Sequence, residues 1–368
     1  MRILHLIDSG GFYGAEAVLI ELVGEQRKQG LDARIGSIGN ADNEKPIEVA
    51  ARAKNLPVHI FKMSAGLNFI GILKLLAFAK KEKFDVIHSH GYKANILLGL
   101  MPQFIRQIPF IITLHGWTSV KALTKMWVYE KMDAYLLKNR KFIVLVSRAS
   151  AQHASLQKVK KNCVVIENGI SSDLPPISKG VEMKKILALK EKGIKIIGSI
   201  GRLSYEKGYD LLIKAVAQCE QEMVLVLMGD GPEKNELQSI AKQYGIEKKV
   251  LFFGYVEQAG QYIPLFDVYV NSSRTEGAPI TLLEAMRAKT PIVARDVGGN
   301  KQLLGNGGYG VVVQGDSPTE MIKSITESME KNDTRVRQAY ESFVKNYSVS
   351  AMTKKYINVY YRLLGVSE

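Results

Sequence analysis

Short hydrophobic runs rich in valine and isoleucine alternate along the chain with longer segments in which hydrophobic residues recur at helical spacing. Such runs predict strands buried on both faces, and their alternation with helices is typical of βαβ units in parallel sheets. The first half contains runs of this kind at 2–7, 32–38, 57–61, 85–89, 110–114, 142–146 and 163–167. The second half contains them at 194–200, 223–229, 250–254, 267–271, 291–295 and 309–313. The pattern predicts an α/β protein with two doubly wound sheets in tandem.

A segment rich in turn-forming residues separates the two halves. Residues 168–180, NGISSDLPPISKG, collect Asn, Gly, Ser and Pro and predict a linker. We therefore expect a Rossmann-like domain at 1–175, a second at 176–348, and a cleft between the carboxyl edges of the two sheets. Residues 349–368 follow as a C-terminal helix, in which Met352, Tyr356, Val359 and Leu363 form one hydrophobic stripe.

The composition fits a globular protein and narrows its class. Among the 368 residues, 46% are hydrophobic and 23% are charged, which excludes disorder, and no short repeat indicates a fibrous rod. The two cysteines, Cys163 and Cys219, lie too far apart for a disulfide scaffold or a metal knuckle, so we expect buried thiols of a cytosolic protein. The opening hydrophobic run is too short for a signal peptide, and no run has the roughly 18 apolar residues of a membrane span.

The formal charge of +14 is concentrated in the first half, where residues 1–175 contain 24 Lys or Arg and 14 Asp or Glu. This excess is compatible with nucleic acid, an anionic membrane or an acidic substrate. Two basic amphipathic segments, 67–84 and 118–142, are equally compatible with membrane-surface helices and with helices packed on the sheet. The second segment interleaves aromatic residues with Lys121, Lys125, Lys131, Lys138, Arg140 and Lys141.

The strongest candidate for a binding site is the loop GRLSYEKG at 201–208, which follows an expected strand and precedes an expected helix. It supplies the guanidinium of Arg202 and the ammonium of Lys207, two groups suited to a diphosphate. The alternative is a solvated turn with two surface cations. We favour the diphosphate site because loops at the carboxyl edge of parallel strands bind ligands in such sheets.

A second candidate follows the strand at 267–271. There Pro279 is expected as the first residue of a helix, and the free amides of Ile280, Thr281 and Leu282 would favour a phosphate. Glu276 precedes this helix, and Glu284 lies inside it at a distance along the axis of roughly one sugar, at about 1.5 Å per residue. Both carboxylates could accept hydrogen bonds from sugar hydroxyls.

Two further features at expected strand ends carry weaker signals. The loop SGGFYGAE at 9–16 is a glycine-rich turn of phosphate-binding type, although it fits neither GxGxxG nor GxxxxGK[ST]. Three histidines, His88, His90 and His115, also end expected strands, where packed or hydrogen-bonded histidines are more common than catalytic ones. We predict no metal site, because the histidines lack a carboxylate partner and the chain lacks an Asp-x-Asp diphosphate motif.

Taken together, these motifs resemble the family 4 retaining glycosyltransferases of GT-B fold, especially bacterial enzymes of surface polysaccharide assembly. The resemblance rests on GRLSYEKG, on TEGAPITLLEAM with its Glu-x7-Glu spacing, and on YGAE, TLH, VSRAS, IENGI, MGDGPEKNELQ, FFGYV and DVGG. It implies two Rossmann-like domains facing across a cleft, with a C-terminal helix crossing back to the first. The chain departs from the family at Ala278 and Pro279, and at Asn300, which follows DVGG.

The resemblance also implies roles for individual residues. Arg202 and Lys207 would bind the diphosphate of a nucleotide sugar, together with the helix start at Ile280, Thr281 and Leu282. Glu284 would hold the ribose hydroxyls and Glu276 the hydroxyls of the donor sugar.

On the other side of the expected cleft, Gly11 and Gly14 would bring backbone to the phosphates. His115 would lie beside the donor sugar and the acceptor, and the base would rest near Tyr255 and Val256. His115, Glu276, Arg202 and Lys207 would form the catalytic set, with no metal and no cofactor.

The sequence therefore predicts a retaining, metal-independent transferase that moves a hexose from a nucleoside diphosphate sugar, with a UDP-sugar favoured over a GDP-sugar. The expected acceptor is a glycan or a lipid-linked molecule in polysaccharide synthesis. We expect a cytoplasmic protein, peripheral at the inner membrane face, that binds no nucleic acid. The alternatives are a noncatalytic module that binds membrane or nucleic acid, or an epimerase of the same fold; a phosphorylase would need a cofactor lysine that we do not find.

Overall fold

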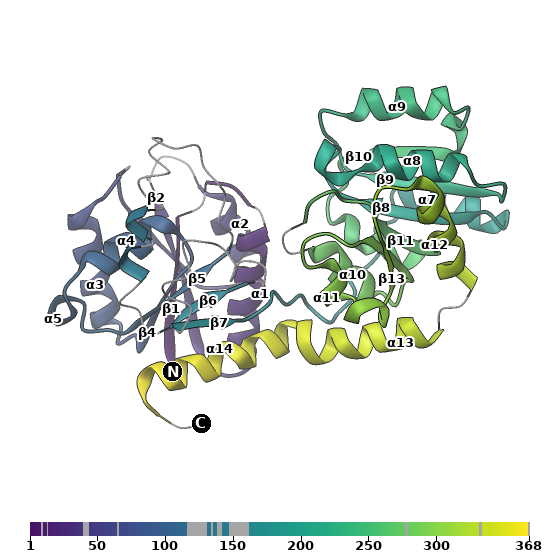
Figure 1. Cartoon of the computed structure of the whole chain (residues 1–368). Coiled ribbons are helices and arrows are strands. Elements are labelled where there is room, and N and C mark those ends of the chain that lie inside the picture. Colours follow the sequence, from purple (N-terminus) through teal and green to yellow (C-terminus); the bar gives the residue numbers. More distant parts are fainter. Residues whose placement is uncertain are drawn as a thin grey trace. The chain divides into compact units, whose positions relative to one another are not determined.

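In the computed structural model (Figure 1), the chain folds into two compact units. The first comprises Met1–Gly169 with Val349–Glu368, and the second comprises Ile170–Ser348. The residues that the structure describes are 1–8, 10–12, 14–39, 44–64, 66–115, 131–133, 135–137, 142–146, 162–276, 279–330 and 333–366.

The first unit contains a seven-stranded parallel sheet in the order β3-β2-β1-β4-β5-β6-β7. Its strands are β1 (Arg2–Ile7), β2 (Asp32–Gly39), β3 (Val58–Lys62), β4 (Val86–Ser89), β5 (Phe110–Leu114), β6 (Ile143–Leu145) and β7 (Cys163–Val165). Its helices include α1 (Gly14–Lys28), α2 (Pro46–Ala53), α3 (Phe69–Lys81), α4 (Tyr92–Leu100), α5 (Gln103–Arg106) and α14 (Val349–Leu364).

The second unit contains a six-stranded parallel sheet in the order β10-β9-β8-β11-β12-β13. Its strands are β8 (Lys195–Ile200), β9 (Met223–Met228), β10 (Val250–Gly254), β11 (Val268–Asn271), β12 (Ile292–Arg295) and β13 (Val311–Val313). Its helices are α7 (Val181–Glu191), α8 (Tyr209–Ala217), α9 (Lys234–Gln243), α10 (Ile280–Arg287), α11 (Asn300–Leu303), α12 (Pro318–Glu330) and α13 (Asp333–Ser342). The unit also contains short 3₁₀ helices, η3 (Tyr205–Lys207), η4 (Glu247–Lys249), η5 (Ala259–Leu265) and η6 (Gly305–Gly307), and one π-helical turn, η7 (Phe343–Tyr347).

The thirteen expected strands are all present, each within two residues of its predicted bounds. Their hydrophobic runs form strands because both faces are covered. In β9, Leu225 and Leu227 join the hydrophobic cluster on one face, while Val224 and Val226 join the cluster on the other. The period of two in a continuous apolar run is the signature of a doubly covered parallel strand. The predicted α/β class with two Rossmann-like sheets is confirmed.

The last helix, α14, belongs to the first unit, where it packs beside α1. Its predicted hydrophobic stripe is buried: Met352, Tyr356 and Val359 are each at most 3% exposed, and Leu363 is 9% exposed. Tyr360, which extends the same face, is also fully buried and directs its hydroxyl into the interior of the unit. The first unit is therefore assembled from two stretches of chain that are separated by the whole second unit.

Two local predictions were wrong. Cys163 and Cys219, expected to be buried, are both thiols that are partly exposed, because β7 lies at the sheet edge and Cys219 follows the end of α8. Pro279, expected as the first residue of α10, precedes that helix, since its ψ of 88° lies outside the helical region.

The amphipathic segment 67–84 is α3 with its flanks, and Asn68 caps it by accepting a hydrogen bond from the Gly71 amide at 2.7 Å. Most of 118–142, including Lys121, Lys125 and Lys138, lies outside the described residues. Among the described helices, none is both long and apolar enough to cross a membrane.

Candidate active site

The strand order of the second sheet reverses between β8 and β11, which are parallel neighbours in the sheet although β9 and β10 lie between them in sequence. At such a switch point, the loops that leave the carboxyl ends of the two strands diverge and open a binding crevice. Here these loops are 201–208, which contains GRLSYEKG, and 272–279, which leads into α10. The topology thus brings the two strongest sequence motifs to one edge of one sheet.

Glycines allow these loops to pack backbone against backbone. Gly208 adopts a φ of 63°, and a Cβ at this position would overlap the carbonyl of Ser272 in the neighbouring loop. The Ser272 hydroxyl also donates a hydrogen bond to the carbonyl of Lys207 at 2.9 Å. Gly298, in the DVGG loop, has a φ of 56° and lies against the backbone of Glu276 in the same way. The positions of Lys207 and Glu276 are therefore fixed by contacts between main chains.

Lys207 and Glu276 meet directly at this edge. The Lys207 Nζ lies 2.6 Å from Glu276 Oε1, and the same oxygen accepts hydrogen bonds from Asn271 Nδ2 at 3.1 Å and Ser273 Oγ at 2.7 Å. The Glu276 side chain is only 8% exposed, whereas that of Lys207 is 30% exposed. Arg202 is exposed and forms no hydrogen bond or ion pair with the described residues, although it acts electrostatically on the exposed Glu206. This edge of the sheet therefore presents the Arg202 guanidinium and the Lys207 ammonium, which still has two N–H groups available for a ligand.

A second ion pair supports the loop that carries Lys207. The Arg274 guanidinium donates two hydrogen bonds to the Asp210 carboxylate, at 2.8 and 2.9 Å, and a third to the Tyr205 carbonyl. It also lies over the Tyr205 ring, 4.3 Å from the centroid. This bidentate pair raises the pKa of Arg274 and ties the loop after β11 to the loop after β8. Sequence reasoning missed it, since nothing in the motif indicates which basic residue is structural.

The N-terminus of α10 offers two free backbone donors instead of three. The Leu282 amide, expected to be free, donates to the Pro279 carbonyl at 3.1 Å. The amides of Ile280 and Thr281 have no partner among the described residues. The helix dipole adds a partial positive charge at the same point. An anion at this end of α10 would be bound by two amides.

Glu284 lies on the first turns of α10, against a second element. A Cβ on Gly260 of η5 would overlap the Glu284 carboxylate, so only glycine leaves room for this side chain. Burial raises the pKa of Glu284, and the nearby Arg287 opposes that shift. Its carboxylate accepts no hydrogen bond from the described residues and is free for hydroxyls. Tyr255 and Val256, between β10 and η5, precede Gly260 by a few residues, and Tyr255 is 80% exposed.

In the first unit, the glycine-rich loop leads from β1 to α1, which begins at Gly14. Gly11 lies in a bend of this loop, and Ser9 and Tyr13 lie outside the described residues. Glu16, on the first turn of α1, is 4% exposed and acts electrostatically on His115 at the end of β5. The loop after β1 and the histidine thus belong to one edge of the first sheet.

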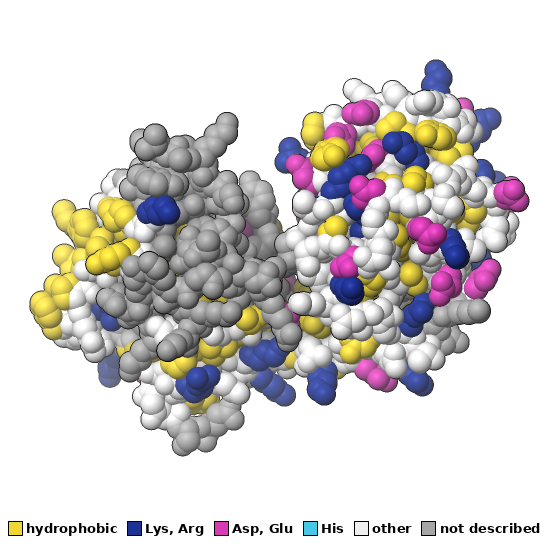
Figure 2. Space-filling view, viewed as in Figure 1, with side chains coloured by type: hydrophobic (Ala, Val, Ile, Leu, Met, Phe, Trp, Pro, Cys, Tyr) yellow, Lys and Arg dark blue, Asp and Glu magenta, His cyan; other side chains and the backbone are white. Residues whose placement is uncertain are grey.

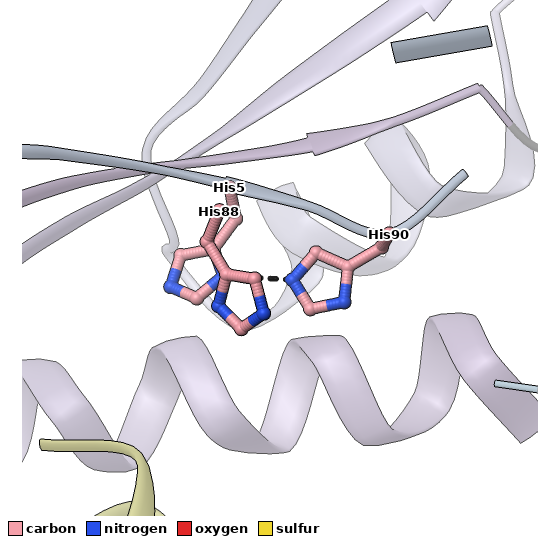
Figure 3. A group of neighbouring side chains, drawn as sticks. All are labelled: His5, His88 and His90. Atoms are coloured by element: carbon pink, nitrogen blue, oxygen red, sulfur yellow. Dashed lines mark hydrogen bonds between the residues drawn. The ribbon is translucent and has the colours of Figure 1, made fainter. Parts of the chain in front are cut away.

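Three buried histidines and the partly buried His115 form one cluster at this edge. The rings of His5, His88 and His90 lie close together, with centroid distances between 4.0 and 5.3 Å, and Figure 3 shows the hydrogen bond between His5 and His90. His115 joins through His90, with 2.9 Å between His90 Nδ1 and His115 Nε2. Burial lowers the pKa of His5 and of His115 to about 4, and those of His88 and His90 well below the usual value. The four rings are therefore neutral at neutral pH.

The same cluster has the ligand types of a metal site, since nitrogens of His5, His88 and His90 lie within 4.8 Å of one another. All six of their ring nitrogens already have partners. His5 bonds to Gln26 and His90, His90 also to His115, and His88 to Tyr360 and Thr113. A cation would have to replace these hydrogen bonds, so the donor set fits a hydrogen-bonded network better than a metal.

Both halves of the chain match known families. Residues 182–344 match the family described as glycosyl transferases group 1, and residues 12–174 match glycosyltransferase family 4. The two matches correspond to the second and first units and together span most of the sequence.

This chain belongs to glycosyltransferase family 4.

Known relatives agree with this assignment. This glycosyltransferase is 26% identical over 293 residues to the O-antigen biosynthesis glycosyltransferase WclY of Escherichia coli, covering 77% of this chain and 80% of that protein. It is 25% identical over 281 residues to the UDP-Gal:alpha-D-GlcNAc-diphosphoundecaprenol alpha-1,3-galactosyltransferase of E. coli, covering 73% and 72% of the two chains. Among solved structures, HepE of Anabaena in complex with UDP superimposes with a TM-score of 0.81 at 24% identity, covering 98% and 99%. The fold of the glycosyltransferase is therefore GT-B, as the sequence predicted.

Within each unit of the glycosyltransferase, the structure brings several predicted site residues together. Lys207 and Glu276 are in contact, and His88, His90 and His115 share one cluster. Sequence reasoning missed the residues that hold these groups in place, which are His5, Gln26, Tyr360, Asn271, Ser273, Asp210, Arg274 and Asn300. Asn271 could have been found as the polar last residue of a buried strand, and Asn300, fully buried, bonds to it at 3.3 Å. His5 and Tyr360 lie in hydrophobic runs and gave no separate signal.

Proposed function

We propose that this glycosyltransferase moves a sugar from a nucleoside diphosphate sugar, with a UDP-sugar favoured, to a lipid-linked or glycan acceptor in the synthesis of cell-surface polysaccharide. The observation that carries the proposal is the cationic edge at the β8–β11 switch point, where Lys207 contacts Glu276 and Arg202 is unpaired among the described residues. The UDP bound to HepE and the UDP-Gal donor in the name of the E. coli galactosyltransferase favour UDP. That enzyme's diphosphoundecaprenol acceptor favours a lipid-linked acceptor.

In this proposal each group at this edge of the sheet binds a different part of the nucleotide sugar. The diphosphate lies between Arg202, Lys207 and the free amides of Ile280 and Thr281. Glu284 accepts hydrogen bonds from the ribose hydroxyls, which brings the base to the loop at Val256. Glu276 accepts hydrogen bonds from the donor sugar. Gly11 and Gly14 lend backbone to the phosphates, and His115 contacts the donor sugar and the acceptor.

The chemistry of sugar transfer explains why cations are needed at this point. When the bond between the anomeric carbon and the diphosphate breaks, negative charge develops on the leaving oxygen. Arg202, Lys207 and the start of α10 would stabilise this charge, and these two cations would make a metal ion unnecessary. We propose retention by a front-face reaction, in which the departing phosphate oxygen accepts the proton of the attacking hydroxyl. No second carboxylate near Glu276 among the described residues suggests a covalent nucleophile.

The first experiment tests donor binding with nucleotide sugars one at a time. One donor, at a hundredfold excess over its Kd, should stabilise the protein by about 2.7 kcal/mol and be consumed in the presence of acceptor. Glu284→Gln and Gly260→Ala should each raise the Kd of that donor by about tenfold or more, since a hydrogen bond to a charged group contributes roughly 1.5–3 kcal/mol. Thermal unfolding with and without donor measures both effects.

The matched control is Glu236→Gln, which removes an exposed carboxylate from α9 and should leave donor binding unchanged. If none of the nucleotide sugars stabilised the protein, the proposed donor class would be contradicted. Binding without turnover in the presence of polyprenyl diphosphate-linked and soluble glycan acceptors would contradict the proposed transfer and favour a binding module or an epimerase.

An exposed apolar patch on the first unit bears on the acceptor. We define it as the exposed face of α3 with α5 and the end of α4, namely Phe69, Ile70, Leu73, Leu100, Phe104 and Ile105. Ile70 is 71% exposed and Phe104 is 77% exposed. Figure 2 shows hydrophobic side chains gathered on this part of the unit, at the left of the view. Exposed Lys74, Lys80 and Lys81 lie on the same helix, so we propose that the patch rests on an anionic membrane that holds the acceptor.

Replacing Ile70 and Phe104 together with glutamate should lower binding to vesicles containing phosphatidylglycerol by at least tenfold. Two apolar side chains would be removed from the bilayer and two negative charges added. Co-sedimentation measures the bound fraction, and vesicles of phosphatidylcholine alone should bind the wild type weakly. Val181→Glu, at a 62% exposed position on α7 of the second unit, is the control and should bind as the wild type does. Equal binding by the double variant would show that this patch does not face the membrane.

A further inference from the structure

A single unbranched chain of hydrogen bonds connects the last helix of the protein with His115. Tyr360 of α14 contacts Gln26 of α1 at 3.2 Å, and Gln26 contacts His5 Nε2 at 2.8 Å. His5 Nδ1 then lies 3.0 Å from His90 Nε2, and His90 Nδ1 lies 2.9 Å from His115 Nε2. In the other direction the Tyr360 hydroxyl contacts His88 Nδ1 at 2.7 Å. All these groups except His115 are at most 7% exposed, so water cannot substitute for a missing partner.

The donors and acceptors of this hydrogen-bond chain all point the same way along it, because its histidines are neutral. Burial keeps the pKa of each ring well below neutral pH, so each ring has one nitrogen that donates and one that accepts. Because His5, His90 and His115 bond directly to one another, fixing the proton of one of these three rings fixes the protons of the other two. Two self-consistent arrangements exist, and they differ in which nitrogen of His115 carries the proton.

Gln26 selects between these arrangements. Its Nε2 donates to the Tyr360 hydroxyl, and its Oε1 faces His5. An amide oxygen can only accept, so His5 must carry its proton on Nε2 and accept at Nδ1. His90 then donates from Nε2 and accepts at Nδ1. His115 must in turn donate from Nε2, which leaves Nδ1 without a proton.

The hydrogen-bond chain ends at His115 Nδ1, and this nitrogen lacks a partner that a ligand could supply. His115 Nδ1 is a buried nitrogen with no hydrogen-bond partner among the described residues, whereas its Nε2 is bonded to His90. A buried acceptor without a partner costs roughly 1–3 kcal/mol, and such atoms in native proteins commonly have a functional explanation. An acceptor at this position would bind a hydroxyl group.

We propose that Gln26 and Tyr360 are positioning residues that hold His115 in its Nε2–H tautomer, so that Nδ1 accepts a hydrogen bond from a hydroxyl of the sugar donor or the acceptor. The identity of the hydroxyl rests on the proposed function, but the tautomer does not. The side chains in this relay come from β1, α1, the end of β4, the end of β5 and α14. Gln26 and Tyr360 are 334 positions apart in sequence.

The test is nitrogen NMR of the full-length protein labelled with ¹⁵N-histidine, at neutral pH and without substrate, with His115 assigned by its loss in His115→Gln. In the wild type, His115 should show a protonated Nε2 and an unprotonated Nδ1. Tyr360→Phe removes the acceptor that orients the Gln26 amide, and Gln26→Met removes the amide itself. In both variants His115 should become a mixture of tautomers, with the Nδ1 resonance shifted toward the protonated position.

Tyr356→Phe is the matched control. This hydroxyl is equally buried on the same helix, one turn before Tyr360, but it contacts Thr113 beyond His88 and so lies outside the path from Gln26 to His115. The His115 tautomer should be unchanged in this variant. A wild-type His115 protonated on Nδ1, or a pure Nε2–H tautomer in both Tyr360→Phe and Gln26→Met, would overturn the relay.

Activity separates the relay from the proposed function. In Tyr360→Phe, kcat should fall in proportion to the lost fraction of Nε2–H tautomer, while the donor KM stays the same. A mixed tautomer with an unchanged kcat would overturn the contact between Nδ1 and a substrate hydroxyl. If the wild type transferred no sugar, the proposed function would fail while the NMR result on the tautomer would stand.

Discussion

Lys207→Ala should lower kcat for sugar transfer by about a hundredfold or more, and Arg202→Ala should do the same. Loss of one group that stabilises a developing oxyanion typically costs about 10²–10³ in rate. Lys207 is the better defined of the two, because its ammonium is fixed 2.6 Å from Glu276 and has further donors to offer a phosphate. Steady-state kinetics with the donor found by screening would measure kcat and KM separately.

The stability of the Lys207 variant should change little, since the Lys207 side chain is 30% exposed and Glu276 keeps its hydrogen bonds from Asn271 and Ser273. Lys323→Ala removes an exposed ammonium from α12, in the same unit, and should transfer sugar at the wild-type rate. Transfer within threefold of wild type by both Arg202→Ala and Lys207→Ala would refute the diphosphate site.

Acid should unfold the first unit over a narrow pH range because of its buried histidines. The pKa of each unfolded histidine is near 6.5, whereas burial lowers that of His5 and of His115 to about 4 in the folded protein. Between these values the unfolded chain binds more protons than the folded one, so the free energy of unfolding is fully present above pH 6.5 and falls as the pH drops. The slope approaches about 1.4 kcal/mol per pH unit for each such histidine, and His88 and His90 shift in the same direction.

Urea unfolding at a series of pH values, followed by tryptophan fluorescence, measures this slope. The chain has two tryptophans, Trp117 and Trp127, and both lie in the first half of the sequence. His90→Gln should remove one titrating group and make the slope shallower by about 1.4 kcal/mol per pH unit. His59→Gln removes an exposed histidine on β3 and should have a smaller effect. A free energy of unfolding that is constant from pH 7 to pH 5 would show that the histidines titrate normally.

The sequence predicted the architecture well because its signals are local. A run such as MVLVLM at β9 reveals a doubly buried strand without any knowledge of its neighbours, and glycines mark the loops that follow. Lys207 and Glu276 could be singled out for the same reason, since each lies in a polar loop directly after such a run. Their hydrogen bond was beyond the sequence argument, because it depends on β8 and β11 being adjacent and on two loops meeting at Gly208.

The parts that could not be predicted depend on contacts between distant segments. His5 is an inward-facing residue of β1 in a hydrophobic run, and only the folded unit shows that Gln26 and His90 complete its hydrogen bonds. Tyr360 continues the hydrophobic stripe of α14, so its hydroxyl gave no separate signal. The exposure of Ile70 likewise depends on which face of α3 meets the sheet, which a segment this apolar does not indicate.

The placement of α14 has a consequence for synthesis of the protein on the ribosome. The first unit needs Tyr356 and Tyr360 to cover His88, yet the second unit, Ile170–Ser348, must be translated before α14 is made. At about 5–20 residues per second this delay is roughly 10–40 s. During that interval, the nascent first unit exposes the apolar surface of α1 and the edge that carries its histidines. Its folding can be completed only after the second unit has been synthesised, so the cell must protect this surface for longer than the order of the domains alone would suggest.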